Sequence, residues 1–488
     1  MPNFIKKHFK ILFCTILLIG FLMRLVVINQ SFWLDEAIGV IAAKTLTFKE
    51  IAINFVKADN HPPLYYLFLK LWGDNLGYSE VSVRLLSIFF SMLTLTVVYK
   101  ICQFFNKSKN QSLLTILFLA TSPFYIYYSQ EARMYSLATL GASLCLWSFL
   151  LILKKENINK FLPWFFFSFS VVFLIFSDYV PVFLLPIFLL YALYSRKDTA
   201  WWKRFLVSFI PLLIMGLFWI PVVLAQSERG RILINTLPSW LKVAGGANLK
   251  QLVLVWTKFT LGRISFYPKT LYYSLISIFS VPLIISFLSS LKKIKENLLI
   301  WLWLVIPLLL GFIISFLFPV FIYFRFLFIL PAFYFLIGVG ILNFKNKLVR
   351  IILIAALLIV NLTGWLIYVK DPSQQREMWR EAVKLIESKA KDNEISIFNY
   401  PEPFAPYRWY ATKVRGVGVA DSISVHKEKT ETLTKLAIKD KKGIYYFEYL
   451  WQLSDPNRVV EETLKFQGFK QKEVYNFNGV GLVSYWQK

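Results

Sequence analysis

Long apolar segments, separated by short polar connections, recur along the first three quarters of the chain. A helix needs about 20 apolar residues to cross about 30 Å of hydrocarbon, and in lipid only helices and closed barrels satisfy every backbone hydrogen bond. The pattern therefore predicts a polytopic α-helical membrane protein with about eleven transmembrane helices. The predicted spans lie near residues 11–28, 81–101, 112–128, 135–153, 161–177, 180–195, 205–225, 271–291, 298–318, 325–342 and 351–369.

The pattern changes at about residue 370, where polar residues become more frequent. A helix is predicted from about Glu377 to Lys391, and the runs 395–398 and 443–447 are typical of short buried strands. A segment of this length can form its own core. The sequence therefore predicts two domains: a transmembrane domain over residues 1–369 and a small α/β domain over residues 370–488.

Composition and charge agree with a membrane protein. Hydrophobic residues make up 57% of the chain and aromatic residues 18%, which is more than in ordinary soluble domains. The net charge is +26, and residues 1–369 hold 34 of the 54 Lys and Arg but only 12 of the 28 Asp and Glu. The positive charge therefore belongs mainly to the membrane part.

The basic residues of the membrane part gather in alternate connections between the spans. These clusters are Lys6/Lys7/Lys10, Lys107/Lys109, Lys154/Lys155/Lys160, Arg196/Lys197/Lys203/Arg204, Lys292/Lys293/Lys295 and Lys345/Lys347/Arg350. By the positive-inside rule this alternation places the N-terminus in the cytoplasm. Because these residues orient helices and no basic and aromatic motif accompanies them, we expect no binding to nucleic acid.

This orientation places three larger segments outside: the first loop (29–80), the loop 226–270, and the domain 370–488. The function is expected there. The first apolar run is predicted to be an uncleaved anchor, because Met23-Arg24-Leu25-Val26 offers no small-residue cleavage pattern. Three cysteines lie within predicted spans or directly at the end of one, and indicate neither a disulfide framework nor a metal cluster. They are Cys14, Cys102 and Cys145.

Two adjacent carboxylates, Asp35 and Glu36, end the motif SFWLDE directly after the first span. A carboxylate at the membrane surface can take a proton from an acceptor hydroxyl, while a neighbouring acid holds the acceptor or a cation. The alternative is structural, with Asp35 capping the N-terminus of the following helix. The residues alone leave both interpretations open.

A second motif, from His61 to Tyr66, follows in the same loop, and its two prolines predict the start of a helix. Tyr65 and Tyr66 are expected near the interface, where aromatic residues collect. His61 can donate a hydrogen bond to a phosphate, and a structural role is the alternative.

A third motif, from Tyr128 to Tyr135, joins the third and fourth spans and contains Glu131 and Arg133. A charge beside the membrane is costly unless it is paired or used. A guanidinium matches phosphate oxygens and stays charged, so Arg133 can stabilise a departing phosphate. The alternative is an internal ion pair between Glu131 and Arg133 that closes a tight turn.

Two more arginines are predicted at the outer ends of spans, against the positive-inside bias. Arg325 follows Tyr323-Phe324 at the start of the tenth span, and Arg84 lies near the start of the second. Such residues either reach lipid head groups or bind an anionic ligand.

The chain resembles the bacterial and archaeal membrane glycosyltransferases of the GT-C fold in the order of five motifs: SFWLDE, HPPLYYLFLKLW, VRLLSIFF, YSQEARMYSL and FRFLFILP. The resemblance covers roughly residues 1–340 and is to the superfamily that contains protein O-mannosyltransferases and the lipid A aminoarabinose transferase. It implies an inverting transferase that moves a sugar from a polyprenyl phosphate to an acceptor hydroxyl at the outer face of the membrane.

The resemblance also implies the site residues. Asp35 matches the family's catalytic base, Glu36 a supporting acid and Glu131 the acid of the second loop. The residues expected to bind the donor phosphate are His61, Arg133, Arg325 and Arg84, and those expected to contact substrate are Tyr65, Tyr66, Tyr135, Asp178 and Tyr179. Relatives often have His-Tyr where this chain has Asp178-Tyr179, and an acid there can alter the choice of donor or acceptor.

The expected partners are a polyprenyl-phosphate-linked sugar, a lipid, glycan or protein acceptor, and membrane lipids. No Asp-x-Asp pair is present to hold a nucleotide through a metal, and His8, His61 and His426 are too scattered for a zinc site. We therefore expect no metal and no other cofactor, although the sequence leaves a divalent cation open.

The expected location is the plasma membrane of a prokaryote, with the domain 370–488 outside the cytoplasm. One alternative function is a flippase or transporter of lipid-linked sugars, in which the same arginines pass a phosphate head group across the membrane. Transporters often show paired repeats and broken helices at the midplane. The sequence shows no such symmetry, and its charged motifs lie at one face.

Overall fold

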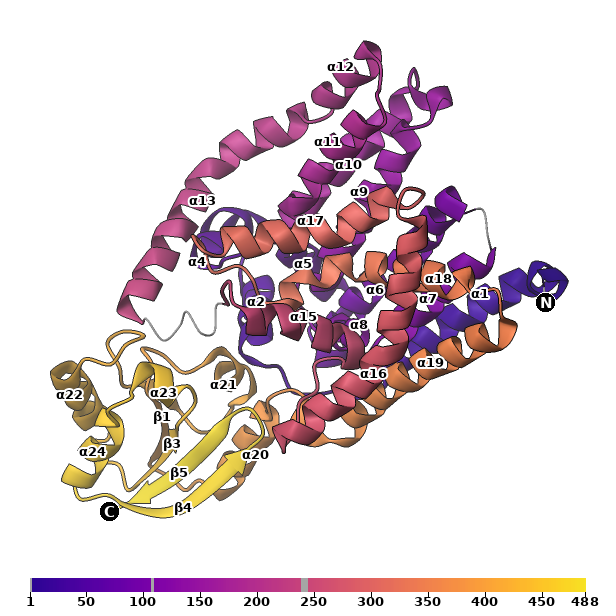
Figure 1. Cartoon of the computed structure of the whole chain (residues 1–488). Coiled ribbons are helices and arrows are strands. Elements are labelled where there is room, and N and C mark those ends of the chain that lie inside the picture. Colours follow the sequence, from indigo (N-terminus) through magenta and orange to yellow (C-terminus); the bar gives the residue numbers. More distant parts are fainter. Residues whose placement is uncertain (1, 107–108, 238–244) are drawn as a thin grey trace.

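The computed structural model describes residues 2–106, 109–237 and 245–488 (Figure 1). The membrane part consists of helices, and the C-terminal part is a sheet with helices on both faces. In Figure 1 the C-terminal part, in yellow, lies at one end of the helical part, with its helix α21 (Ala405–Tyr410) beside α2 (Leu34–Thr45).

The helices of the first half of the membrane part are α1 (Pro2–Leu25), α2 (Leu34–Thr45), α3 (Phe48–Glu50), the π-helix η1 (Ile51–Phe55), α4 (Val56–Ala58), α5 (Leu64–Leu76), α6 (Glu80–Asn106), α7 (Lys109–Thr121), α8 (Pro123–Ser129), α9 (Tyr135–Ile152), the 3₁₀-helix η2 (Lys155–Asn157), α10 (Phe161–Ser177), the 3₁₀-helix η3 (Val180–Leu184) and α11 (Leu185–Tyr194). Those of the second half are α12 (Thr199–Val207), α13 (Ile210–Thr236), α15 (Leu249–Leu261), α16 (Lys269–Ser290), the 3₁₀-helix η5 (Leu291–Lys293), α17 (Leu298–Ile314), the 3₁₀-helix η6 (Tyr323–Ile329), α18 (Leu330–Asn343) and α19 (Lys347–Lys370).

The multi-pass helical class is confirmed, but the count of eleven spans is not. Within the described ranges, seven helical segments are long and apolar enough to cross a membrane, and the bent pair α7–α8 makes an eighth if it counts as one span. At three other predicted spans the structure has shorter apolar helices: α10, η3 with α11, and α17. Proline explains one of them, because Pro181 and Pro186 begin new helical turns where a continuous α-helix was expected.

The first loop, residues 29–80, is mostly helical and packs against the bundle. Pro63 precedes α5, so the predicted helix start after the two prolines is confirmed. At Pro123 the chain bends by 59° between α7 and α8, and the Ser122 hydroxyl accepts a hydrogen bond from the backbone N–H of Tyr125 at 3.4 Å. This bend carries the chain into the turn 130–134, which holds the third motif.

The C-terminal part is a five-stranded sheet with the strand order β2-β1-β3-β5-β4. The strands are β1 (Glu394–Phe398), β2 (Gly416–Gly418), β3 (Gly443–Phe447), β4 (Lys470–Phe477) and β5 (Gly481–Gln487), and the helices are η7 (Pro372–Gln374), α20 (Trp379–Lys389), α21 (Ala405–Tyr410), α22 (Lys427–Ala437), α23 (Trp451–Ser454) and α24 (Val459–Phe466). β1 pairs in parallel with β2 and β3, whereas β5 is antiparallel to β3 and β4.

Alternation along β3 builds one apolar core on each face of the sheet. Tyr445 and Phe447 pack with α20 on one face, whereas Ile444 and Tyr446 pack with α24 on the other. The predicted helix near 377–391 and both predicted strands are confirmed, with α20 two residues shorter at each end. The domain boundary at 369/370 stays a prediction, although α19 ends at Lys370.

The two parts meet beside α2. The Phe32 ring lies 5.5 Å from the Trp409 ring, and the Phe32 backbone N–H donates to the Tyr410 hydroxyl at 2.7 Å. The C-terminal part therefore packs directly on the segment that carries the paired carboxylates.

Candidate active site

Asp35 lies in the first turn of α2 and faces a cavity. Its side chain is 39% exposed, and its Oδ2 is 3.6 Å from Nη2 of Arg133. The N-cap of α2 is Trp33, and among the described residues no side chain caps this helix, so Asp35 is not a cap. Burial raises the pKa of Asp35 above its usual range, Arg133 lowers it, and Asp59 and Glu36 raise it further.

The cavity in front of Asp35 has a volume of about 430 Å³ and lies between the two parts of the chain. Asp35 and Ile38 of α2 line one side, and Tyr400, Glu402 and Arg408 of the C-terminal part line another. A molecule in this cavity can contact the carboxylate and the C-terminal part together.

Glu36 is fully buried and forms a bidentate ion pair with Arg84 of α6. Nε of Arg84 donates to Oε1 at 3.0 Å and Nη2 to Oε2 at 2.6 Å. Arg84 also donates to three backbone carbonyl oxygens, those of Ile28, Gln30 and Ser31. These bonds use all five guanidinium N–H groups. The sequence suggested that Arg84 reaches lipid head groups or binds a phosphate. In the structure it does neither, because its donors are all used, and it fixes the backbone before Asp35 instead.

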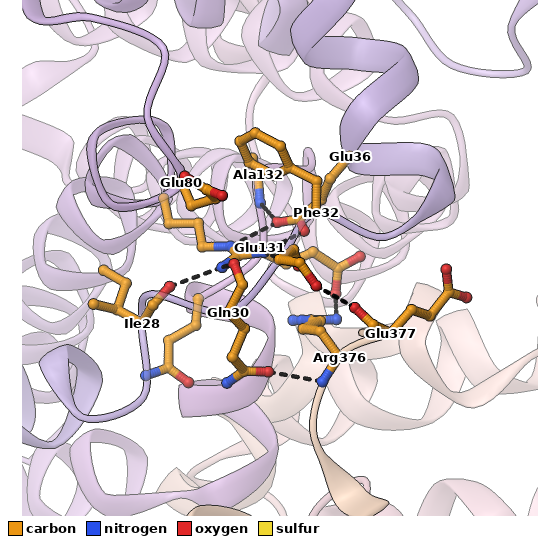
Figure 2. A network of polar contacts seen from close by, with 12 residues as sticks. Ile28, Gln30, Phe32, Glu36, Glu80, Glu131, Ala132, Arg376 and Glu377 are labelled. Carbon is orange, nitrogen blue, oxygen red and sulfur yellow. Dashed lines mark hydrogen bonds and ion pairs between the residues drawn. The ribbon is translucent and has the colours of Figure 1, made fainter. Parts of the chain in front are cut away.

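Glu36 also links the first loop to the turn 130–134. Its Oε1 accepts a hydrogen bond from the backbone N–H of Ala132 at 2.7 Å, within the third motif (Figure 2). Burial alone would raise the pKa of Glu36, but Arg84 and the Ala132 N–H outweigh it and hold that pKa below its usual value. Glu36 is thus a charged anchor without access to the cavity.

Glu131 and Arg133 lie two residues apart, but each pairs with another part of the chain. Oε2 of Glu131 lies 2.7 Å from Nη1 of Arg376, in the segment between η7 and α20. Arg133 contacts Asp35 and donates from Nη1 to the Tyr66 hydroxyl at 2.9 Å. The internal pair that the sequence offered as an alternative is therefore not what holds this turn.

Tyr65 and Tyr66 are buried instead of lying in an interfacial belt. The Tyr65 hydroxyl is 2.8 Å from the Ser87 hydroxyl, and the Tyr66 hydroxyl donates to Asp59. Tyr66 thus joins Asp59 to Arg133. Asp59 was not predicted as a site residue, because nothing in its local sequence distinguishes it.

His61 lies close enough to Asp59, Arg133 and Arg325 for their charges to affect it. Burial above all, helped by the charges of Arg133 and Arg325 and opposed by that of Asp59, lowers the pKa of His61 to about 3. The imidazole is therefore neutral at physiological pH, with one N–H to donate. Its Nδ1 is buried and has no hydrogen-bond partner among the described residues.

Asp178 and Arg325 belong to the same side of the site. Burial raises the pKa of Asp178, and the charge of Arg325 opposes this. Nη1 of Arg325 donates to the Pro319 carbonyl oxygen at 3.2 Å. The Tyr179 hydroxyl donates to Oε1 of Gln226 at 2.8 Å, which ties this corner to α13.

A second cavity, of about 250 Å³, lies on the other side of the SFWLDE segment. Its walls include Glu131 and Tyr135 of the third motif, Arg263 after α15, and Arg376 and Glu377 of the C-terminal part. Burial raises the pKa of Glu377 to about 7, although Trp379 and Tyr449 donate hydrogen bonds to its carboxylate. Arg263 and Arg376 were missed from the sequence because neither lies in a motif.

The described residues contain no group of three or more His, Cys, Asp or Glu side chains that could hold a metal ion. The cation at ion-pair distance from Asp35 is the guanidinium of Arg133.

The chain is similar to one family model and, at low sequence identity, to several solved structures. Residues 60–224 match the family model of dolichyl-phosphate-mannose-protein mannosyltransferases, and no curated protein sequence matches. ArnT from Cupriavidus metallidurans in the apo state is similar with a TM-score of 0.61 at 12% identity, over 99% of this chain and 98% of that chain. The chain has the GT-C fold.

Two further solved structures share this GT-C fold. ArnT bound to undecaprenyl phosphate has a TM-score of 0.59 at 12% identity, over 98% of each chain. An oligosaccharyltransferase from Archaeoglobus fulgidus, tethered with an acceptor peptide, has a TM-score of 0.53 at 11% identity, over 100% of this chain and 75% of that chain. The resemblance inferred from the motifs is therefore confirmed in fold, and residues 60–224 add a match in sequence.

Proposed function

We propose that this protein is an inverting glycosyltransferase that moves a sugar from a polyprenyl phosphate to an acceptor hydroxyl at the outer face of the membrane. One observation carries the proposal: the Asp35 carboxylate faces a cavity, 3.6 Å from Arg133, and is 39% exposed. ArnT, which shares the fold, has been solved bound to undecaprenyl phosphate. A lipid-linked donor would deliver its phosphate to the membrane surface, where we expect Asp35 and its cavity to lie.

In this proposal Asp35 takes the proton of the acceptor hydroxyl while the hydroxyl oxygen attacks the anomeric carbon of the sugar. The bond between that carbon and the phosphate oxygen breaks, and polyprenyl phosphate leaves with the bonding electrons. Attack from the face opposite the phosphate inverts the anomeric carbon. A positioned base contributes typically about 10² to 10⁴ in rate.

The leaving phosphate would be stabilised by Arg133 and Arg325, the two arginines close to His61. Arg133 and Arg325 supply positive charge, and neutral His61 supplies an N–H donor. No metal is needed for this neutralisation, so we propose a metal-independent reaction. Arg84 and Glu36 act differently: they hold the backbone around Asp35, because their polar atoms already bond to each other and to the two outer loops.

The test is release of polyprenyl phosphate from a panel of radiolabelled polyprenyl-phosphate sugars by the purified protein in lipid, with a panel of acceptors. Asp35→Asn is expected to lower turnover by about 100-fold or more while donor binding persists. Glu156→Gln is the control, because Glu156 is an exposed carboxylate that lines neither cavity. A chelator is expected to leave the rate unchanged.

Three results would contradict the proposal. They are donor binding without turnover in the wild type across all acceptors, an equal loss in Glu156→Gln and Asp35→Asn, and translocation of the intact donor between leaflets in place of transfer.

A further inference from the structure

Arg376 belongs to the C-terminal part but is buried in the membrane part, with 6% of its surface exposed. Its Nη1 is 2.7 Å from both Oε2 of Glu131 and the Tyr127 hydroxyl. Its Nη2 donates to the Tyr127 carbonyl oxygen at 3.1 Å, and its guanidinium carbon lies 3.9 Å from the centre of the Tyr127 ring. One side chain thus holds both ends of the turn that connects α8 to Glu131.

The same segment also holds the first outer loop. The backbone N–H of Arg376 donates to Oε1 of Gln30 at 2.7 Å, and the Ser31 hydroxyl donates to the carbonyl oxygen of Glu377. Figure 2 shows Arg376 between Gln30 and Glu131, on a loop that belongs to the C-terminal part. The residues 376–377 therefore touch both loops that carry the charged motifs.

The charge of Arg376 has a specific partner. Glu131 is 1% exposed, and a carboxylate buried this deeply needs a cation or several hydrogen bonds to stay charged. Arg133 is directed to Asp35 and Tyr66, and Arg263 donates to the Tyr127 hydroxyl. Arg376 is the partner at ion-pair distance from Glu131.

We propose that Arg376 is a positioning residue of the transferase: it holds Glu131 and, through Tyr127 and Gln30, the two loops that place Arg133 and Asp35. The inference rests on the proposed function. It makes the C-terminal part a component of the active site, because without Arg376 the acid Glu131 has no cation at ion-pair distance among the described residues, and both loops lose a tether.

The experiment compares Arg376→Gln with Arg380→Gln in the transfer assay. Arg380 is a matched control, because it also joins the two parts, through Glu80 at 3.2 Å and the Asn29 carbonyl oxygen at 2.9 Å, but touches neither charged motif. Arg376→Gln is expected to lower kcat by about 100-fold, the typical cost of a misplacement of about 1 Å. The donor KM is expected to rise by less than about tenfold, since Arg133 shifts with its loop whereas Arg325 remains in place.

Arg376→Lys is expected to recover part of the lost kcat, because an ammonium can pair with Glu131 but cannot make the forked bonds to Tyr127. A role limited to folding would lower the yield of folded protein and leave kcat per folded molecule unchanged. That result, or equal losses of kcat in Arg376→Gln and Arg380→Gln, would overturn the inference.

If Arg376→Gln does not fold, Glu131→Gln is compared with the double variant Glu131→Gln/Arg376→Gln, which leaves no unpaired charge at this position. When two residues act as a unit, the second substitution is expected to change kcat by less than about twofold. A further loss of about tenfold would overturn the inference. Absence of turnover in the wild type overturns the proposed function and this inference with it, whereas normal turnover in Arg376→Gln overturns the inference alone.

Discussion

Asp35 and Glu36 are adjacent in the sequence but have opposite electrostatic environments. Glu36 faces Arg84, which lowers its pKa, whereas burial, Asp59 and Glu36 raise the pKa of Asp35 against Arg133. A base must be ionised, so we predict that kcat/KM falls as the pH is lowered through the pKa of Asp35. Because that pKa is raised, the acid limb is expected above the value of about 3.9 for a free Asp. A pH–rate profile measures it.

Asp59→Asn provides the comparison for that profile. Removing the negative charge of Asp59 relieves its repulsion of ionised Asp35, so the acid limb is expected to move to lower pH. Glu156→Gln, in the exposed helix η2, is expected to leave the limb in place. An acid limb that stays unchanged in Asp59→Asn would mean that Asp35 is not the titrating group.

The sequence motifs located much of this network but not its pairings. The sequence drew attention to four charged residues, because a charge beside the membrane is costly unless it is paired or used. The structure brings all four together: Asp35, Glu36, Glu131 and Arg133. Their partners could not be read from the chain, since Arg84 is 48 residues from Glu36 and Arg376 is 245 from Glu131. Arg376 follows a helix end in an ordinary polar segment, and only the docking of the C-terminal part brings it to Glu131.

The helices α16 and α18 approach each other closely at Gly340. A Cβ added at Gly340 would lie 1.6 Å from the Ser286 carbonyl oxygen, so Gly340→Ala must push the two helices apart. We predict a loss of about 1–3 kcal/mol in stability, the usual cost of overpacking. Thermal unfolding of the purified protein in lipid or detergent measures this change.

Gly216→Ala in α13 is the control for that substitution. A Cβ at Gly216 would meet no atom within 4 Å among the described residues, and alanine favours a helix over glycine. Its melting temperature is expected to stay equal or rise slightly. If Gly340→Ala and Gly216→Ala melt at the same temperature, the close approach of α16 and α18 contributes nothing to stability.

Element boundaries show where hydropathy stops being informative. The apolar runs predicted a helix at every span, and helices are present there. Hydropathy could not reveal that η3 and α11 divide at prolines or that α7 and α8 meet at 59°. Lipid contact and burial inside the bundle select the same residue types, so a short buried helix and a full span look alike in sequence.

At the scale of the whole molecule, the basic connections and the C-terminal part are predicted to lie on opposite sides of the membrane. The helix α9 runs from Tyr135, beside the charged motif, to Ile152, beside the Lys154/Lys155/Lys160 cluster. Eighteen helical residues extend about 27 Å, close to the thickness of the hydrocarbon core. The site and this basic cluster are therefore about one bilayer core apart, as the positive-inside rule requires of an outer site.

Labelling with a membrane-impermeant maleimide tests this arrangement without any knowledge of the substrate. In a variant without Cys14, Cys102 and Cys145, a single cysteine is introduced either as Lys472→Cys in β4 or as Lys155→Cys in η2, both exposed positions. Intact cells are expected to be labelled only in Lys472→Cys, and permeabilised cells in both. Labelling of Lys155→Cys alone in intact cells would place Asp35 on the cytoplasmic side. Nucleotide sugars are available there, so the argument for a lipid-linked donor would no longer hold.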